Sequence, residues 1–376
     1  MKPGKALIRT FLVFTGAAMT GLWAMKPSTA FEAVPPADVE SFRESWRVLA
    51  PITASNLAIY PVVSDINADT SEFLTLDAGV ASGEVRIAER GALENGMIRR
   101  RTARRWPPVE TDVAPSAYQG ASVNELVLVN DSSRPLILLS GEVVSGGKQN
   151  RIIGMDLIVP PKSEPVSLTV FCVEHGRWSS GPAAFGSAGA IAHPGIRAEA
   201  EFSKNQSGVW DKVGGTGAAM GVGSPTGSYM DMVTSPMAER ARKAVELPIE
   251  REFEQKLREA LRGRGVVGAV VAINGQLVWS DVFSSAALFR EYWPKLLRSY
   301  AVEAQSQPGV SKPLPGLKEA QAFLEAVHGH VTVESRSGVY RRTEIASTGF
   351  QVEALEALEG KADSGLLIHY NKMARD

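Results

Sequence analysis

The sequence predicts an α+β fold: an antiparallel β-meander with a sandwich-like sheet system, followed by helices, a β-hairpin and a C-terminal β-rich segment. Three observations predict it. Four apolar runs between residues 125 and 174 are joined by short polar turns, so consecutive strands must be antiparallel. Apolar residues recur every four positions from Ile249 to Leu261, which is the spacing of one helix face. Asn274-Gly275 separates two apolar runs and suits a type I′ hairpin turn.

The first thirty residues have the pattern of a secretory signal peptide. Lys2, Lys5 and Arg9 precede the apolar run Phe11–Met25, and small residues follow it before Phe31. A basic start, a short apolar stretch and a small-residue exit are typical of a cleaved export signal. The apolar run is shorter than the ~20 residues of a membrane-spanning helix, and an uncleaved membrane anchor is the alternative. We therefore expect an exported protein, periplasmic or extracellular, whose mature chain begins near Phe31.

Length, charge and cysteine content exclude several classes of function. The 376 residues are enough for one large or two ordinary domains. A formal charge of −1 gives no overall attraction for nucleic acid, and only the amino-terminal run could contact a membrane, as an uncleaved anchor. One cysteine excludes an intrachain disulfide and a multi-cysteine metal site. The expected partner is therefore an unknown small molecule or protein, and we expect no cofactor.

Strand signals begin after a helical start. Residues 31–56 are predicted as helical, and strand-like runs at 56–63 and 83–90 flank a short predicted helix at 76–81. Five arginines follow between Arg99 and Arg105. They indicate either an anion-binding patch or a solvated loop whose arginines pair with acids elsewhere.

The meander and the segments after it complete the predicted order. The four meander strands are expected at 125–130, 136–144, 151–159 and 166–174. A glycine-rich stretch at 203–236 is predicted as a loop, either a mobile flap or disorder, because it is too long for an ordinary connection. Helices and a hairpin follow at 238–305, with a helical segment broken at Pro248 and another restarting at Pro294. After a helix at 317–327, the tail is predicted to form strands.

Several segments of the chain, in order, resemble one known family. They are LLSGEVVSGGKQNRIIG, FCVEHGRW, SGVWDKV, VVGAVVAINGQLVWSDVF and LFREYWPKLLRSYAVEA. Together they are similar to the ARG-and-rhodanese-phosphatase-superfamily-associated protein domain, from about Leu57 to Tyr300. The resemblance implies a family domain over residues 31–310 and a C-terminal α/β segment over 311–376. It names no reaction, because no biochemical role is assigned to the family.

Polar residues gather at the strand ends and turns of the meander, and we call them the strand-end cluster. They are Glu142, Lys148, Gln149, Asn150, Arg151, Glu174, His175, Arg177 and Trp178. A scaffold commonly places functional groups at such positions. In a ligand site, Arg151 or Arg177 would bind an anion and Trp178 would stack on the ligand. Glu142 or Glu174 would act as acid or base. The alternative is a structural ion-pair network that orders the sheet edge.

The predicted turns also give a register for the meander. Counting outward from them places Arg151 opposite both Glu142 and Glu174, on the face that carries Cys172. The strand that contains Cys172 is apolar on both faces through Val173, so we interpret the thiol as a core residue rather than a nucleophile.

Two classes of function remain open, and whether the protein is an enzyme is not decided. We prefer an exported domain that binds a polar or anionic ligand or partner through the strand-end cluster, because no assembled catalytic grouping is visible. The alternative is a hydrolase-type enzyme that uses Glu174 or His175 as acid or base. His328 and His330 could point the same way from a strand, but two ligands make no metal site, so none is expected.

Overall fold

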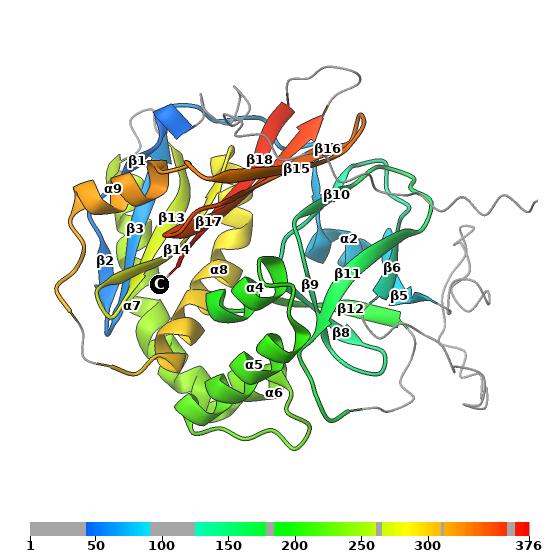
Figure 1. The fold of residues 1–376 in the computed structure, drawn as a ribbon, viewed down its shortest axis with the longest axis horizontal. Helices are drawn as coiled ribbons and strands as arrows, with labels where there is room; N and C mark the ends of the chain where they lie inside the picture. Colours follow the sequence, from blue (N-terminus) through cyan, green and yellow to red (C-terminus); the bar gives the residue numbers. More distant parts are fainter. Residues whose placement is uncertain are drawn as a thin grey trace, which may run out of the picture.

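The computed structural model describes most of the chain after the predicted signal peptide. The described residues are 43–90, 125–177, 184–260, 265–309, 312–358 and 365–375. The predicted signal peptide, the arginine-rich stretch and Trp178 lie outside them. Within them the α+β prediction is confirmed, because antiparallel sheets and helices account for the architecture. Figure 1 shows a large sheet beside a barrel, with helices packed between and below them.

The larger sheet has nine strands, which come from both ends of the described chain. Their order is β1-β3-β13-β14-β18-β17-β16-β15, and β2 also pairs with β3. The strands are β1 (Arg47–Val48), β2 (Ile52–Ala54), β3 (Leu57–Ser64), β13 (Gly265–Ile273), β14 (Gln276–Phe283), β15 (His330–Arg336), β16 (Tyr340–Ala346), β17 (Phe350–Leu358) and β18 (Gly365–Ala374). The predicted helix over 31–56 is wrong at 47–54, where two short strands pair with β3 and bury Ile52. The tail joins this same sheet through β14 and β18.

The smaller system is a closed barrel with a three-stranded sheet beside it. The barrel order is β11-β6-β5-β12-β8-β9, and the small sheet order is β10-β7-β4. The strands are β4 (Leu74–Thr75), β5 (Val85–Glu89), β6 (Glu125–Asn130), β7 (Leu136–Leu138), β8 (Glu142–Gly146), β9 (Arg151–Ile153), β10 (Leu157–Val159), β11 (Val166–Cys172) and β12 (Ala184–Ile191). Two predicted meander strands, 136–144 and 151–159, are each split. The chain bends at Gly141, in the left-handed region with a φ of 85°, and at Gly154–Asp156.

Besides helical residues at 43–45 and at 90, seven helices are defined in the described residues. They are α2 (Leu76–Ser82), α4 (Pro194–Glu201), α5 (Gln206–Met220), α6 (Tyr229–Thr234), α7 (Pro236–Ala260), α8 (Ala286–Ser306) and α9 (Leu317–Glu325). The predicted loop at 203–236 therefore contains two whole helices. One of its glycines serves close packing, because a Cβ on Gly217 would lie 2.6 Å from Met232 Sδ. Helices α7 and α8 continue through Pro248 and Pro294, because their buried faces outweigh the cost of an interior proline.

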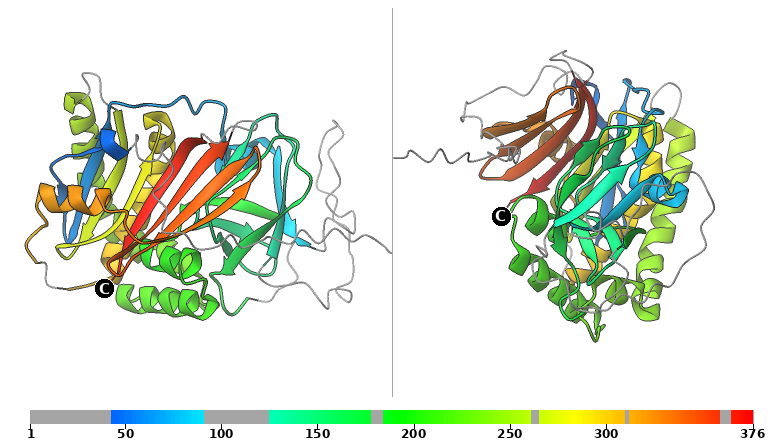
Figure 2. Two further views of the ribbon diagram at one scale, coloured as in Figure 1. Left: turned by 45° about the horizontal axis from the view of Figure 1, so that its top comes forward. Right: turned by 90° about the vertical axis from the view of Figure 1, so that its right-hand side faces the viewer.

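Helix α8 connects the two sheet systems. It packs against β13 of the large sheet and β12 of the barrel. Its side chains at every fourth position, Leu288, Tyr292, Leu296 and Tyr300, are fully or almost fully buried there. Helices α4 and α5 lie below the sheet and the barrel in the left view of Figure 2. No helix among the described residues is both long and apolar enough to cross a membrane.

Candidate functional site

Arg151 opens β9 at a register that differs from the predicted one. It lies opposite Val144 on β8 and opposite Cys172 on β11, not opposite Glu142 and Glu174. Each pairing is shifted by two positions, so Arg151 keeps its predicted face but not its predicted partners. The partners Val144 and Arg151 are separated by the six residues 145–150, and β10, which precedes the turn to β11, pairs with β7 rather than with β11. The predicted row of one arginine between two glutamates is therefore wrong in register.

Glu142 consequently belongs to a different environment from the rest of the cluster. Its Oε1 lies 2.7 Å from Lys295 Nζ on α8, and its Oε2 accepts the Leu139 N–H at 2.9 Å. Lys295 Nζ also pairs with Asp77 Oδ2 at 2.9 Å. Complete burial raises the pKa of Glu142, although Lys295 opposes the shift. Glu142 thus anchors α8 to the barrel and does not converge with Glu174.

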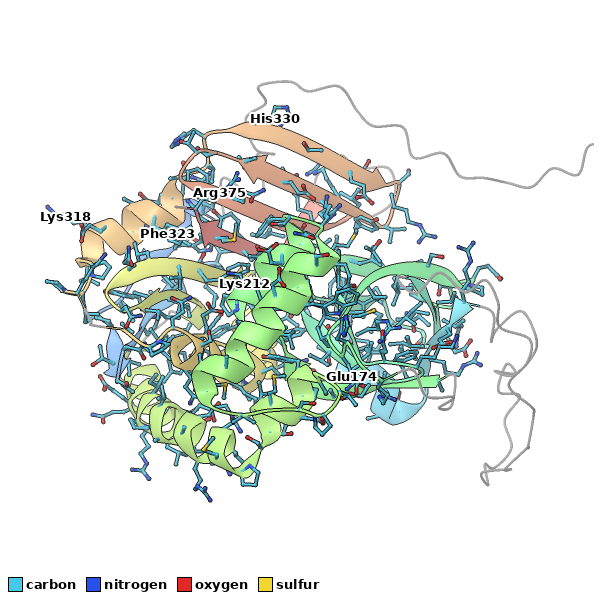
Figure 3. All side chains as sticks on the ribbon, turned by 60° about the horizontal axis from the view of Figure 1, so that its bottom comes forward. Glu174, Lys212, Lys318, Phe323, His330 and Arg375 are labelled. Atoms are coloured by element: carbon cyan, nitrogen blue, oxygen red, sulfur yellow. The ribbon has the colours of Figure 1, made fainter. Side chains whose placement is uncertain are left out.

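Glu174 is held by donors from three segments. Its Oε2 accepts the backbone N–H of Asn150 at 3.1 Å and the guanidinium of Arg177 at 2.9 Å from Nε and 2.8 Å from Nη2. Its Oε1 accepts the Thr226 hydroxyl at 2.9 Å. Only 3% of the residue is exposed. The carboxylate therefore tethers the loop before α6 to the barrel, at the position labelled in Figure 3.

Arg177 belongs to the same network and lies at its solvent-facing edge. Its Nη1 donates to the Gly147 carbonyl at 3.1 Å, and its Nη2 donates to Asn150 Oδ1 at 3.2 Å. With Glu174 as the third acceptor, every guanidinium nitrogen has a partner within the cluster. Arg177 is still about one quarter exposed, with 28% of its side chain accessible. A ligand could contact it only as an additional acceptor.

The remaining members, together with Trp210 on α5, form a partly exposed rim beside this network. We define the rim as Lys148, Gln149, His175 and Trp210. The His175 side chain is exposed, and its ring meets the Trp210 ring edge-on at 4.7 Å between centroids. Lys148 Nζ lies 3.9 Å from Glu89 Oε2, and its side chain is 32% exposed. Trp210, on α5, was not among the predicted site residues, because nothing in the sequence placed α5 against the barrel.

Two polar atoms of the rim lack hydrogen-bond partners among the described residues. Gln149 is completely buried; its Nε2 donates to the His175 carbonyl at 3.3 Å, but its Oε1 accepts no hydrogen bond. The buried indole Nε1 of Trp210 likewise donates none. Most buried polar atoms in folded proteins are paired, because leaving one unpaired costs about 1–3 kcal/mol. The rim therefore combines an unused acceptor and an unused donor on two residues that contact His175.

Cys172 lies in the core, as its sequence context predicted. It is 2% exposed, and burial raises the pKa of its thiol while Arg151 opposes the shift. Gln206, at the start of α5, pairs with both backbone groups of Cys172: its Oε1 accepts the N–H at 2.8 Å and its Nε2 donates to the carbonyl at 2.9 Å. The position thus supports the docking of α5 and does not expose a nucleophile.

A larger ionic network, absent from the predictions, lies between the barrel and the large sheet. At its centre is Asp281 on β14, which accepts a bidentate pair from Arg197 at 3.0 and 2.9 Å. The Tyr300 hydroxyl also donates to Asp281, and His369 Nε2 lies 3.1 Å from it. Arg197, Tyr300 and His369 come from α4, α8 and β18, and their side chains, like that of Asp281, are fully buried. Arg197 holds the pKa of Asp281 well below its usual range in spite of burial.

The network extends from His369 to the barrel and from α4 to the sheet. His369 Nδ1 lies 2.5 Å from Asp156 Oδ2, in the bend between β9 and β10. The Asp156 N–H donates to Glu353 on β17 at 3.0 Å, and Glu201 on α4 accepts from Asn371 at 2.7 Å. Burial alone would lower the pKa of His369, but the two aspartates outweigh it and raise the pKa to about 9. Burial raises the pKa of Glu201 to about 7.

A third buried group, Thr216, His193 and Glu303, has the residue types of a catalytic triad: a hydroxyl, an imidazole and a carboxylate. His193 contacts Glu303 through Nδ1, and its Nε2 lies 2.8 Å from Thr216 Oγ1. However, the Thr216 hydroxyl donates to the Lys212 carbonyl at 2.8 Å, so its proton points along α5 and not toward the imidazole. The three residues are at most 4% exposed. We interpret the group as a cross-link of α4, α5 and α8 rather than as a catalytic triad.

Comparison with known proteins gives one result. The family model described as ARG and Rhodanese-Phosphatase-superfamily-associated Protein domain matches residues 45–372. This match covers most of the chain and extends past residue 310, where the sequence had suggested a boundary. No curated protein and no solved structure matches the chain.

Proposed function

The chain belongs to the ARG and Rhodanese-Phosphatase-superfamily-associated Protein domain family, and we propose that it is an exported domain that binds a polar or anionic ligand through the strand-end cluster. The observation that carries the proposal is the pair of unused polar atoms beside His175, Gln149 Oε1 and Trp210 Nε1. A ligand with one hydrogen-bond donor and one acceptor could satisfy both atoms.

The positive charges at the rim also favour a ligand that carries an acidic group. Lys148 brings a partly exposed ammonium to the edge of the cluster, and the Arg177 guanidinium lies beside it, about one quarter exposed. The exposed imidazole of His175 lies next to the Trp210 indole, so a planar or apolar portion of the ligand could pack against these rings. A carboxylate or phosphate carried on a small polar molecule combines these features. Export of the mature chain rests on the basic, apolar and small-residue pattern of its first thirty residues.

The hydrolase alternative receives less support from the same geometry. A general base needs a free lone pair directed at the substrate or at a water molecule. Both oxygens of Glu174 already accept hydrogen bonds, and Glu142 lies in a separate buried ion pair with Lys295. Glu142 therefore does not converge with His175, and the carboxylate of Glu174 is engaged by donors of its own network.

A thermal-shift screen tests the proposed binding function. We expect a carboxylated or phosphorylated metabolite to raise the melting temperature of the purified chain, because a ligand that binds only the folded state stabilises it by mass action. Mass spectrometry after incubation should recover the compound unchanged. Conversion of the compound by the chain, abolished in Glu174→Gln, would instead establish the hydrolase.

A further inference from the structure

An open cavity of about 640 Å³ lies at the end of the large sheet. It is lined by His328, Ala346, Ser347, Thr348 and Arg375. Figure 3 labels Arg375 beside Phe323 of α9, well apart from Glu174 at the barrel. The cavity therefore belongs to a different part of the molecule from the strand-end cluster, and it has the size of an ordinary small-molecule site.

The walls of the cavity are fixed by backbone contacts. The Ser347 N–H donates to the Phe350 carbonyl at 2.9 Å, which closes the turn between β16 and β17. The Arg375 N–H donates to the Gly349 carbonyl at 3.0 Å, so the end of β18 is attached to the same turn. On the other side, a Cβ on Gly329 would lie 2.4 Å from the Ala346 carbonyl oxygen, so the segment that carries His328 packs tightly on β16.

The described lining residues carry a guanidinium, an imidazole and two hydroxyls, and no carboxylate. Behind them, the buried Lys372 Nζ lies 3.8 Å from the centroid of the Phe350 ring, and His328 meets the same ring edge-on at 5.2 Å. Lys372 donates to the carbonyls of Phe323 and Ala326 at the end of α9. Burial, together with the positive charge of Arg43, lowers the pKa of Lys372 to about 7. The guanidinium of Arg375, with an imidazole and two hydroxyls and no carboxylate among the described lining residues, therefore favours an anion.

We propose that this cavity binds the oxyanion group of a small molecule, a phosphate or a carboxylate, between the Arg375 guanidinium and the His328 imidazole. The hydroxyls of Ser347 and Thr348 donate to the remaining oxygens, as in many oxyanion sites. Ala346 forms the apolar part of the wall and leaves room for the body of the ligand. This site is independent of the strand-end cluster, so either proposal can fail without the other.

Titration of the full chain with inorganic phosphate and, separately, with acetate tests this second site. At constant ionic strength, we expect at least one anion to raise the melting temperature and to shift the NMR signals of the His328 ring, assigned with His328→Gln. Arg375→Ala should weaken that anion at least tenfold, and Ala346→Glu, which places a carboxylate in the cavity, should abolish its binding. The better probe identifies phosphate or carboxylate as the preferred group.

Two controls separate the cavity from general charge effects and from the rim. Lys318→Ala removes an exposed positive charge from the far end of α9, seen in Figure 3, and should leave anion affinity unchanged. The double variant Lys148→Ala/His175→Ala disables the rim and should also keep the affinity. Equal affinity of Arg375→Ala and the unaltered chain, or no response to either anion, would overturn the proposal.

Discussion

Replacing Asp281 by alanine lowers the free energy of unfolding by about 3–5 kcal/mol, because it leaves buried cations without their partner. Asp281 accepts both terminal nitrogens of Arg197, and His369 Nε2 lies 3.1 Å from it. Arg197 and His369 are completely buried. Water cannot replace the lost carboxylate without opening the contact between the barrel and the large sheet. Urea denaturation of the variant and the unaltered chain gives the difference.

An exposed pair serves as the matched control for Asp281. Lys204 Nζ lies 3.3 Å from Glu344 Oε1, and 52% of the lysine side chain is accessible. Lys204→Ala should change the free energy of unfolding by less than about 1 kcal/mol, as is usual for surface ion pairs. If Asp281→Ala were as mild as Lys204→Ala, the buried network would not be what joins the two sheet systems.

Raising the pH from 6 to 9.5 removes about 3 kcal/mol of stability through His369 alone. Its pKa rises from an ordinary 6.5 to about 9 on folding, because Asp156 and Asp281 outweigh the effect of burial. The folded state therefore binds the proton more tightly than the unfolded state. This stabilisation is complete below pH 6.5 and is lost as the pH rises toward 9. Glu201, whose pKa is raised to about 7, also makes the folded state less stable as the pH rises from about 4.5 to 7.

The change in unfolding free energy between pH 6 and pH 9.5 should be smaller in His369→Gln than in the unaltered chain. The variant will be less stable overall, so the comparison concerns the pH slope and not the absolute stability. His330→Gln is the control, because His330 is exposed at the start of β15 and should leave the slope unchanged. An unchanged slope in His369→Gln would show that the imidazole does not hold its proton in the folded state.

Local patterns predicted the elements whose signals are short-range. The Asn274-Gly275 turn does join two paired strands, β13 and β14, and the four-residue spacing of Ile249 and Phe253 does mark a buried helix face. The glycine-rich stretch was wrongly predicted to be a loop, because glycine lowers helix propensity regardless of context. Only the packed structure shows that Gly217 must be small to contact Met232.

Features that depend on long-range pairing could not be predicted from the chain. Arg197, Asp281 and His369 are separated by more than eighty positions from one another, so no spacing rule connects them. The register of Arg151 failed for a related reason. Loop lengths predict a register only when the strands on both sides of a turn pair with each other, and here β10, the strand before β11, pairs with β7. Trp210 belongs to the candidate site because α5 docks against the barrel, which no local pattern predicted.

Calorimetric titration of the ligand found in the screen, into the unaltered chain and into Trp210→Phe, tests the central claim that the rim binds it. Phenylalanine keeps the ring contact with His175 but removes the indole N–H, which has no partner among the described residues. We predict an unchanged or slightly higher melting temperature and at least tenfold weaker binding, with Lys212→Ala on the same helix as the unaffected control. Equal affinity of Trp210→Phe and the unaltered chain would contradict the account.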